Sequence, residues 1–253
     1  MIQELSLAGA GLIAGFIDSI AGGGGLITLP ALTLVLGPGA PAVGTNKIVG
    51  TVGALAALIV YRRKKAVPVN KAMGFMVGII VGSFTGSRIT PYLDRELFSW
   101  ILIAACPFIL TLILTRQLWI AELSHHAETF TKVRHLKILL TGLACGLYDG
   151  AFGPGGGTFM LLGLIYANGL PLFEALVLSK LANTFSAGTS LISYAQQGFV
   201  HIPEGCAAAS GILIGSISGA RWASKRAEKV VRPMLVFVVL LFLSKLLWDK
   251  FSV

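Results

Sequence analysis

The chain has 253 residues, of which 55% are hydrophobic and 12% charged, with a net charge of +9 and a mean hydropathy of +0.82. Soluble domains usually carry about 25% charged residues, so this composition excludes an ordinary soluble protein. Long apolar runs predict an all-α polytopic protein of the cell (inner) membrane, with the lipid bilayer as a partner. The basic residues cluster between these runs, as membrane topology requires, so we expect no nucleic-acid partner.

Apolar runs predict eight segments, two of which are interrupted by glycines. In chain order they are 5–20 plus 26–36, 42–61, 69–91, 97–115, 136–149 plus 157–168, 174–195, 203–222 and 231–248. The stretch between the fourth and fifth segments, 116–135, is polar and amphipathic. We expect it to be a cytoplasmic linker between a first transmembrane repeat at 1–115 and a second at 136–253.

An internal repeat relates the two halves. At an offset of 131, the residues Gly11, Gly15, Asp18, Gly22 and Gly24 match Gly142, Gly146, Asp149, Gly153 and Gly155. At an offset of 133, the residues Lys47, Thr51, Tyr61, Gly78 and Arg88 match Lys180, Thr184, Tyr194, Gly211 and Arg221. So many matches in one order predict a duplicated unit.

Loop charge predicts that the two repeats are inverted. The first-half loop 62–71 is strongly basic, whereas its counterpart "QQGFVHIPEG" has no Lys or Arg. The next pair of loops reverses the comparison, because 221–232 is basic and "RITPYLDRE" is nearly balanced. Basic loops face the cytoplasm, so 62–71 and 221–232 are predicted cytoplasmic, and both termini are predicted on the outside.

Inverted repeats must each cross the membrane an odd number of times. Each half contains three full-length segments, so the glycine-broken segment must enter and leave on the same side. Residues 26–36 would also span only about half of the ~30 Å core at 1.5 Å per residue. Each repeat is therefore predicted to be a re-entrant helical hairpin plus three transmembrane helices.

The glycine breaks predict an anion site near the bilayer midplane. A helix that starts there offers free N–H groups and a positive dipole end, and glycine lets a ligand approach them closely. The alternative is that the glycines only allow close helix packing. The candidate substrate-binding glycines are Gly22, Gly23, Gly24, Gly25, Gly153, Gly155, Gly156 and Gly157.

Two lysines in apolar surroundings strengthen the anion hypothesis. Lys47 and Lys180 lie near the starts of segments, where each could bind substrate or extend to the membrane surface. Neighbouring donors complete the candidate substrate-binding set: Asn46, Thr51, Ser179, Asn183 and Thr184. Asp18 and Asp149 precede the breaks; they could carry a coupling proton or pair with other groups.

The residues "DSIAGGGGLITLP" followed by "GTNK", and "DGAFGPGGGTFM" followed by "SKLANT", resemble the TauE/SafE family of sulfite and organosulfonate exporters. The resemblance covers nearly the whole chain. It implies a secondary transporter that exports a small sulfur-containing anion, such as sulfite, sulfoacetate or a related organosulfonate. Pro154 stands where the first motif has Gly23, so the two breaks are not identical.

Other functions have less support. A passive anion channel could use the same paired hairpins and stays an alternative, and coupling to protons is left open. The sequence contains no HExxH, GxSxG or GxxxxGK[ST] pattern, so we expect no enzyme activity and no ATP-driven pump. No catalytic residue, metal site or cofactor is predicted, and a homodimer is a possible assembly.

Overall fold

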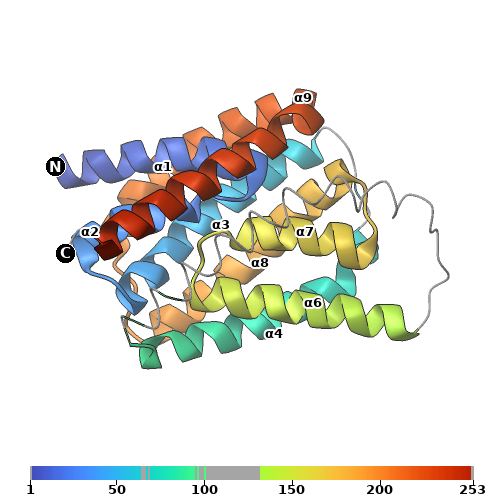
Figure 1. The fold of residues 1–253 in the computed structure, drawn as a ribbon, viewed down its shortest axis with the longest axis horizontal. Coiled ribbons are helices and arrows are strands. Elements are labelled where there is room, and N and C mark those ends of the chain that lie inside the picture. The colour runs from blue at the N-terminus through green and yellow to red at the C-terminus, as the bar shows by residue number, and fades with distance from the viewer. Residues whose placement is uncertain are drawn as a thin grey trace.

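The computed structural model describes residues 2–63, 67, 69–94, 96, 100 and 132–251, and within these all regular structure is helical (Figure 1). The all-α fold is therefore confirmed for the described part of the chain. The helices are α1 (Ile2–Ala21), α2 (Gly25–Leu36), α3 (Ala40–Arg62), α4 (Met73–Ile89), α6 (Lys132–Ala151), α7 (Gly156–Asn168), α8 (Leu172–Gln196) and α9 (Ile202–Phe251), with 3₁₀ turns at Val69–Ala72 and Thr90–Tyr92.

Both predicted glycine breaks are confirmed as breaks between helices. The first separates α1 from α2, and the second separates α6 from α7. Gly22 has a φ of +85° and the matching Gly153 a φ of +92°, a conformation that favours glycine. The short helices after the breaks agree with the predicted segments 26–36 and 157–168.

The two broken helices enter the molecule from opposite ends. In Figure 1, α1 runs from the left end toward the middle, and α2 returns to the left. In the same view, α6 runs from the right end toward the middle, and α7 returns to the right. The N-terminal end of α1 and the C-terminal end of α9 both lie at the left. The two breaks therefore come together near the middle of the molecule.

Glycines on one helix lie against the backbone of another. A Cβ added at Gly211 of α9 would lie 1.8 Å from the Ala8 carbonyl oxygen of α1, and one at Gly78 of α4 would lie 2.3 Å from the Leu139 oxygen of α6. Glycines at four-residue spacing on both helices of each pair make the same kind of approach. Close packing of small residues therefore holds α1 against α9 and α4 against α6.

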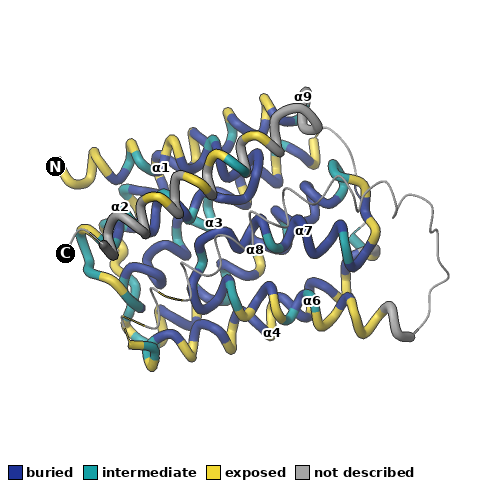
Figure 2. Tube along the Cα trace, viewed as in Figure 1, coloured by how far each residue is buried: buried dark blue, intermediate teal, exposed yellow. Residues whose placement is uncertain are grey.

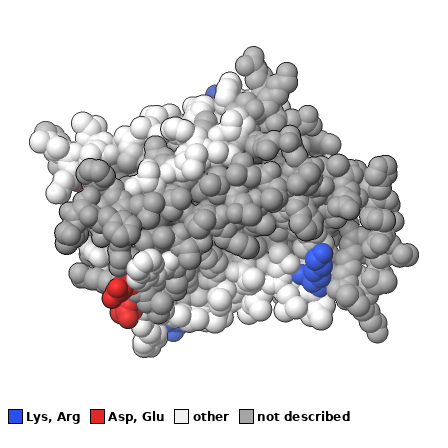
Figure 3. Space-filling view, viewed as in Figure 1, with Lys and Arg blue, Asp and Glu red and all other residues white. Residues whose placement is uncertain are grey.

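The outer surface suits a membrane. Three helical stretches, Ile2–Ala21, Ala40–Arg62 and Met73–Tyr92, are long and apolar enough to cross one. Figure 2 shows the buried residues along the inside of the bundle, with exposed residues on the outer helices. On the face in Figure 3, coloured charges are sparse over the part of the surface that the structure describes.

One predicted loop is wrong. Residues 221–232 have helical backbone and belong to α9, which continues from Ile202 to Phe251. Ala, Lys, Arg and Glu dominate this stretch and are strong helix formers, so its charge did not require a loop. Figure 1 shows the first and last parts of α9 running in opposite directions.

Two predicted segments lie largely outside the described residues. Residues 97–115 lie outside the described residues, apart from position 100, and so do residues 116–131 of the predicted linker. The remaining linker residues, 132–135, form the start of α6. In the other predicted basic loop, α3 ends at Arg62 and a 3₁₀ turn begins at Val69.

Candidate anion site between the two breaks

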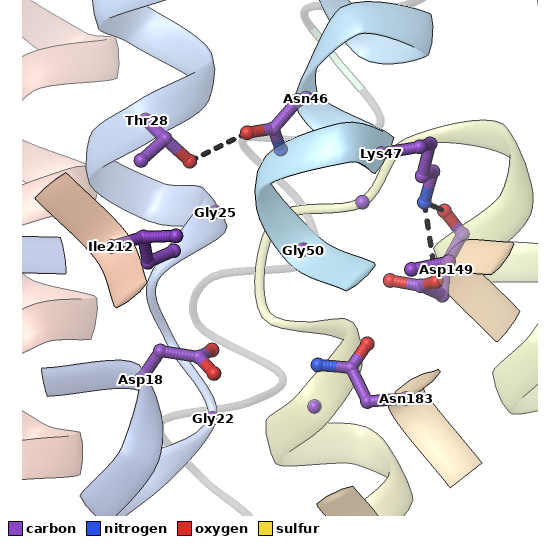
Figure 4. Close-up of a pocket in the computed structure, with 13 residues that line it drawn as sticks. Asp18, Gly22, Gly25, Thr28, Asn46, Lys47, Gly50, Asp149, Asn183 and Ile212 are labelled. Atoms are coloured by element: carbon purple, nitrogen blue, oxygen red, sulfur yellow. Dashed lines mark hydrogen bonds and ion pairs between the residues drawn. The ribbon is translucent and has the colours of Figure 1, made fainter. Parts of the chain in front are cut away.

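A cavity lies where the two glycine breaks meet (Figure 4). Water-sized spheres can occupy about 30 Å³ of it, which is room for about two or three water molecules. Seven helices and both breaks contribute its walls. The lining residues are Asp18, Gly22, Gly25, Thr28, Asn46, Lys47, Gly50, Asp149, Gly153, Gly157, Asn183, Ala187 and Ile212.

Each of the two buried lysines pairs with the aspartate of the other half. Lys47 Nζ lies 3.1 Å from Asp149 Oδ2, and Lys180 Nζ lies 2.9 Å from Asp18 Oδ2. Each ammonium also donates to the main-chain carbonyl of its aspartate. Lys47 is 3% exposed and Lys180 is 1% exposed, so neither extends to the membrane surface. The two ion pairs therefore link the halves and leave this group of four charges neutral.

The two carboxylates have different further partners. Asp18 Oδ1 accepts a hydrogen bond from the Gly24 amide at 3.0 Å, which holds the first break against the end of α1. Asp149 Oδ2 accepts one from Ser186 Oγ at 2.6 Å, in addition to the one from Lys47. Both carboxylates are buried. A buried charge needs an opposite charge and hydrogen bonds, and each carboxylate has both. The additional hydrogen-bond donor is thus a backbone amide at Asp18 and a serine hydroxyl at Asp149.

The breaks pack directly on each other. A Cβ added at Gly22 would lie 2.5 Å from the Gly157 carbonyl carbon, and one at Gly157 would lie 2.8 Å from the Gly22 oxygen. Thr158 Oγ1 donates to the Ala21 carbonyl across this contact at 3.1 Å. Glycine is required here because any side chain would collide with backbone that has no freedom to move aside.

Amide groups at the cavity are available to a ligand. Thr28 Oγ1 donates to Asn46 Oδ1 at 2.6 Å, which turns the Asn46 side chain toward the break. Among the described residues, the Asn46 amide nitrogen and the Asn183 side chain make no hydrogen bond. Figure 4 shows Asn183 and Asp18 facing each other across the cavity. Because unpartnered polar groups are costly inside a protein, these groups favour a polar occupant.

The structure brings together part of the predicted set. Lining the cavity are Asp18, Gly22, Gly25, Asn46, Lys47, Asp149, Gly153, Gly157 and Asn183. Outside its lining are Gly23, Gly24, Thr51, Gly155, Gly156, Ser179, Lys180 and Thr184. Thr51 and Thr184 donate to the Lys47 and Lys180 carbonyls of their own helices, and Ser179 donates to the Leu176 carbonyl.

Sequence reasoning missed several cavity residues. Thr28 lies in the first turn after the break, and its position there could have pointed to it. Gly50 is the offset-133 counterpart of Asn183, so the repeat itself contained that signal. Ile212 and Ala187 come from apolar runs, which do not distinguish cavity wall from core. In the part of the chain that the structure describes, no group of three or more His, Cys, Asp and Glu side chains is placed to hold a metal ion.

Residues 7–246 match the family model described as "Sulfite exporter TauE/SafE". The chain belongs to this family. A "Probable membrane transporter protein" of Haemophilus influenzae is 32% identical over 244 residues, covering 95% of this chain and 92% of the relative. The "Probable membrane transporter protein YfcA" of Escherichia coli K12 is 32% identical over 239 residues, covering 94% and 87%. A more distant relative, the "Probable membrane transporter protein YdhB" of Bacillus subtilis, is 25% identical over 241 residues, covering 92% and 96%.

Membership of the TauE/SafE family makes this chain a transmembrane transporter, which agrees with its apolar helices. The family resemblance seen in the glycine motifs is confirmed. No solved structure matches the chain significantly.

Proposed function

We propose that this TauE/SafE member is a secondary transporter that exports a small sulfur-containing anion, such as sulfite, sulfoacetate or a related organosulfonate, by alternating access. The observation that carries the proposal is the cavity between the glycine breaks. It combines the buried Lys47, unpartnered amides and the first turn of α2, all of which interact favourably with an anion. The family description supplies the sulfur chemistry.

The proposed architecture is two inverted repeats, each with a re-entrant hairpin. Its support is the reciprocal packing of the halves: α1 packs on α9 while α4 packs on α6, and α3 packs on α8. The opposite entry of the two hairpins and the shared end of the termini also support it (Figure 1). In such transporters the substrate lies at the repeat interface, where one repeat rocks against the other. The basic stretches 62–71 and 221–232 are proposed to face the cytoplasm of the inner membrane.

The size of the cavity supports a carrier rather than a passive channel. About 30 Å³ for water-sized spheres holds only two or three water molecules, so we infer that a larger anion is accommodated when the halves move. The two lysines and two aspartates, whose charges cancel, also determine when an anion can bind. An anion gains full attraction from a lysine only when that lysine leaves its aspartate, which couples binding to a change in the contacts between halves.

Counterflow in proteoliposomes tests this function. We expect unlabelled internal sulfoacetate to drive uptake of labelled sulfoacetate, and we expect the initial rate to saturate with concentration. Both follow because a carrier must bind the anion before the halves move. Acetate, which lacks a sulfonate, serves as the comparison anion. A rate that rises linearly with concentration and ignores internal anion would favour the channel, and no sulfoacetate or sulfite flux at all would contradict the proposal.

A further inference from the structure

The two repeats differ most in one pair of equivalent helix contacts. We name the contact of α4 with α8 the polar seam and the equivalent contact of α9 with α3 the apolar seam. Six positions of the polar seam are Ser83, Ser87, Thr90, Ser186, Ser190 and Ser193. At an offset of 133, the corresponding positions of the apolar seam are Ser216, Ala220, Ala223, Gly53, Ala57 and Val60. Five of the six hydroxyls are therefore absent from the apolar seam.

The hydroxyls of α8 form one buried line. Ser186, Ser190 and Ser193 follow each other at spacings of four and three residues, which places them on one face of the helix. All three are fully buried. Ser190 Oγ donates to the Ser83 carbonyl of α4 at 3.3 Å, so the line faces the neighbouring helix. A packed helix contact needs no such hydroxyls, as the apolar seam shows.

The inner end of the polar seam is the carboxylate of Asp149. Ser186 Oγ donates to Asp149 Oδ2 at 2.6 Å, on the same oxygen that binds Lys47. The position equivalent to Ser186 is Gly53, and a Cβ there would lie 3.0 Å from Ile212 Cδ1. Ile212 and the Ser216 hydroxyl thus occupy the space beside Gly53. Within the described part of the chain, Asp18 accepts hydrogen bonds from the Gly24 amide and Lys180, and from no hydroxyl.

The outer end of the polar seam is a polar group at the end of α8. Ser193 Oγ accepts hydrogen bonds from Arg88 Nε and Gln197 Nε2, both at 3.2 Å. Arg88 also donates to Gln196 Oε1 at 2.9 Å, and it is exposed. Buried hydroxyls of α8 therefore lie at one-turn intervals between the Asp149 carboxylate and the surface. Under the proposed topology, the surface end faces the outside.

We propose that Asp149, and not Asp18, is the carboxylate that exchanges protons during transport, and that the protons pass along the polar seam. This inference rests on the proposed function. In the transfer, Asp149 Oδ2 takes the Ser186 hydroxyl proton, and Ser186 Oγ takes a proton in turn from a water molecule between it and Ser190. Only O–H bonds form and break. The Asp149 carboxylate gains one proton and becomes neutral.

Other titratable groups surround Asp149. Lys47 of α3 contacts it directly, Cys145 lies one turn earlier on α6, and Tyr194 of α8 donates to the adjacent Gly150 carbonyl. Asp18 lines the same cavity and is neutralised by Lys180. Protonation of Asp149 removes the charge that holds Lys47, so the Lys47 ammonium becomes available to an anion in the cavity. The proton and the anion are then bound together and move in the same direction.

The test measures proton and anion movement in proteoliposomes of the full chain. A sulfoacetate gradient is imposed, and a lumenal pH dye reports proton flux while labelled sulfoacetate reports counterflow. Sulfoacetate is chosen over sulfite because sulfite itself takes up protons near neutral pH. We expect protons to move with the anion. We expect Ser186→Ala and Ser190→Ala to lower proton flux about tenfold while counterflow stays within about twofold. Ser216→Ala, in the apolar seam, is the matched control and should leave both unchanged.

The outcomes separate two failures. Absence of sulfoacetate counterflow in the unmodified protein contradicts the proposed function and this inference with it. Counterflow without proton movement, or with protons moving against the anion, overturns this inference alone. Equal loss of both fluxes in the Ser186→Ala protein would identify the polar seam as packing or as an anion route, and would also overturn it. Asp149→Asn should lower the number of protons moved per sulfoacetate. Loss of proton movement in Asp18→Asn, with normal proton movement in Asp149→Asn, would contradict the assignment.

Discussion

Replacing Lys180 with alanine should lower the free energy of unfolding by about 3–5 kcal/mol. The ammonium of Lys180 is the buried partner of Asp18, at 2.9 Å from Oδ2, and Lys180 is 1% exposed. Its removal leaves a buried carboxylate with no opposite charge, which is the costly half of breaking an ion pair. The loss is measured by denaturant or thermal unfolding of the purified protein in detergent.

A double variant separates the structural role of Lys180 from its role in transport. Asp18→Asn combined with Lys180→Met removes both charges, so most of the lost stability should return. Lys180→Ala should also lose counterflow, and the double variant should not regain it, because one of the two buried cations beside the cavity is missing. Recovery of both stability and counterflow would show that Lys180 only holds the halves together. If the double variant is no more stable than Lys180→Ala, the proposed energetics of the pair are wrong.

Replacing Gly22 with alanine should prevent the two breaks from meeting. The resulting loss of folding stability should be larger than backbone strain alone would cause. Gly22 has a φ of +85°, and its Cβ would lie 2.5 Å from the Gly157 carbonyl carbon. Strain in a left-handed conformation costs about 1–3 kcal/mol. The collision adds to this, because both partners are backbone. We expect little folded protein by size-exclusion chromatography and no counterflow.

Two matched glycines separate the causes. Gly37 has a φ of +78° but nothing within 4 Å of an added Cβ, so Gly37→Ala should show the strain alone. Gly188 has no such φ and also nothing within 4 Å, so Gly188→Ala should be neutral or slightly stabilising in its helix. An equal loss for the Gly22 and Gly37 variants would contradict the packed contact between the breaks.

The breaks and their neighbours were predictable because they depend on local sequence. Glycine clusters between apolar runs end helices whatever surrounds them, so the ends of α1 and α6 followed from the sequence. Small residues every fourth position identify a close-packed face, as Gly211 and Gly78 show. The helical backbone of 221–232 was missed because loop charge was used as a signal for irregular structure, although those residues favour a helix.

The partners of the lysines were not predictable from either half alone. The repeat aligns Lys47 with Lys180 and Asp18 with Asp149, but it does not say that each lysine crosses to the other half. That pairing depends on how α3 and α8 pack, which no local pattern encodes. The same holds for Ser186, whose importance comes from the position of Asp149 on a different helix. The difference between the two seams could be found in the sequence only once the structure had shown which helices touch.

The central claim is that an anion binds between the two breaks, and Asn183 tests it most directly. Its side chain lines the cavity and makes no hydrogen bond within the described part of the protein, so Asn183→Ala should leave folding intact. Calorimetric titration of sulfoacetate and sulfite is made on the unmodified protein, on Asn183→Ala and on the exposed control Ser210→Ala. A hydrogen bond to a charged group is worth about 1.5–3 kcal/mol. The account therefore predicts that Asn183→Ala binds the anion about 10- to 150-fold more weakly and that the control binds it as tightly as the unmodified protein. Equal affinity in all three proteins, or no binding of either anion, would contradict a site in this cavity.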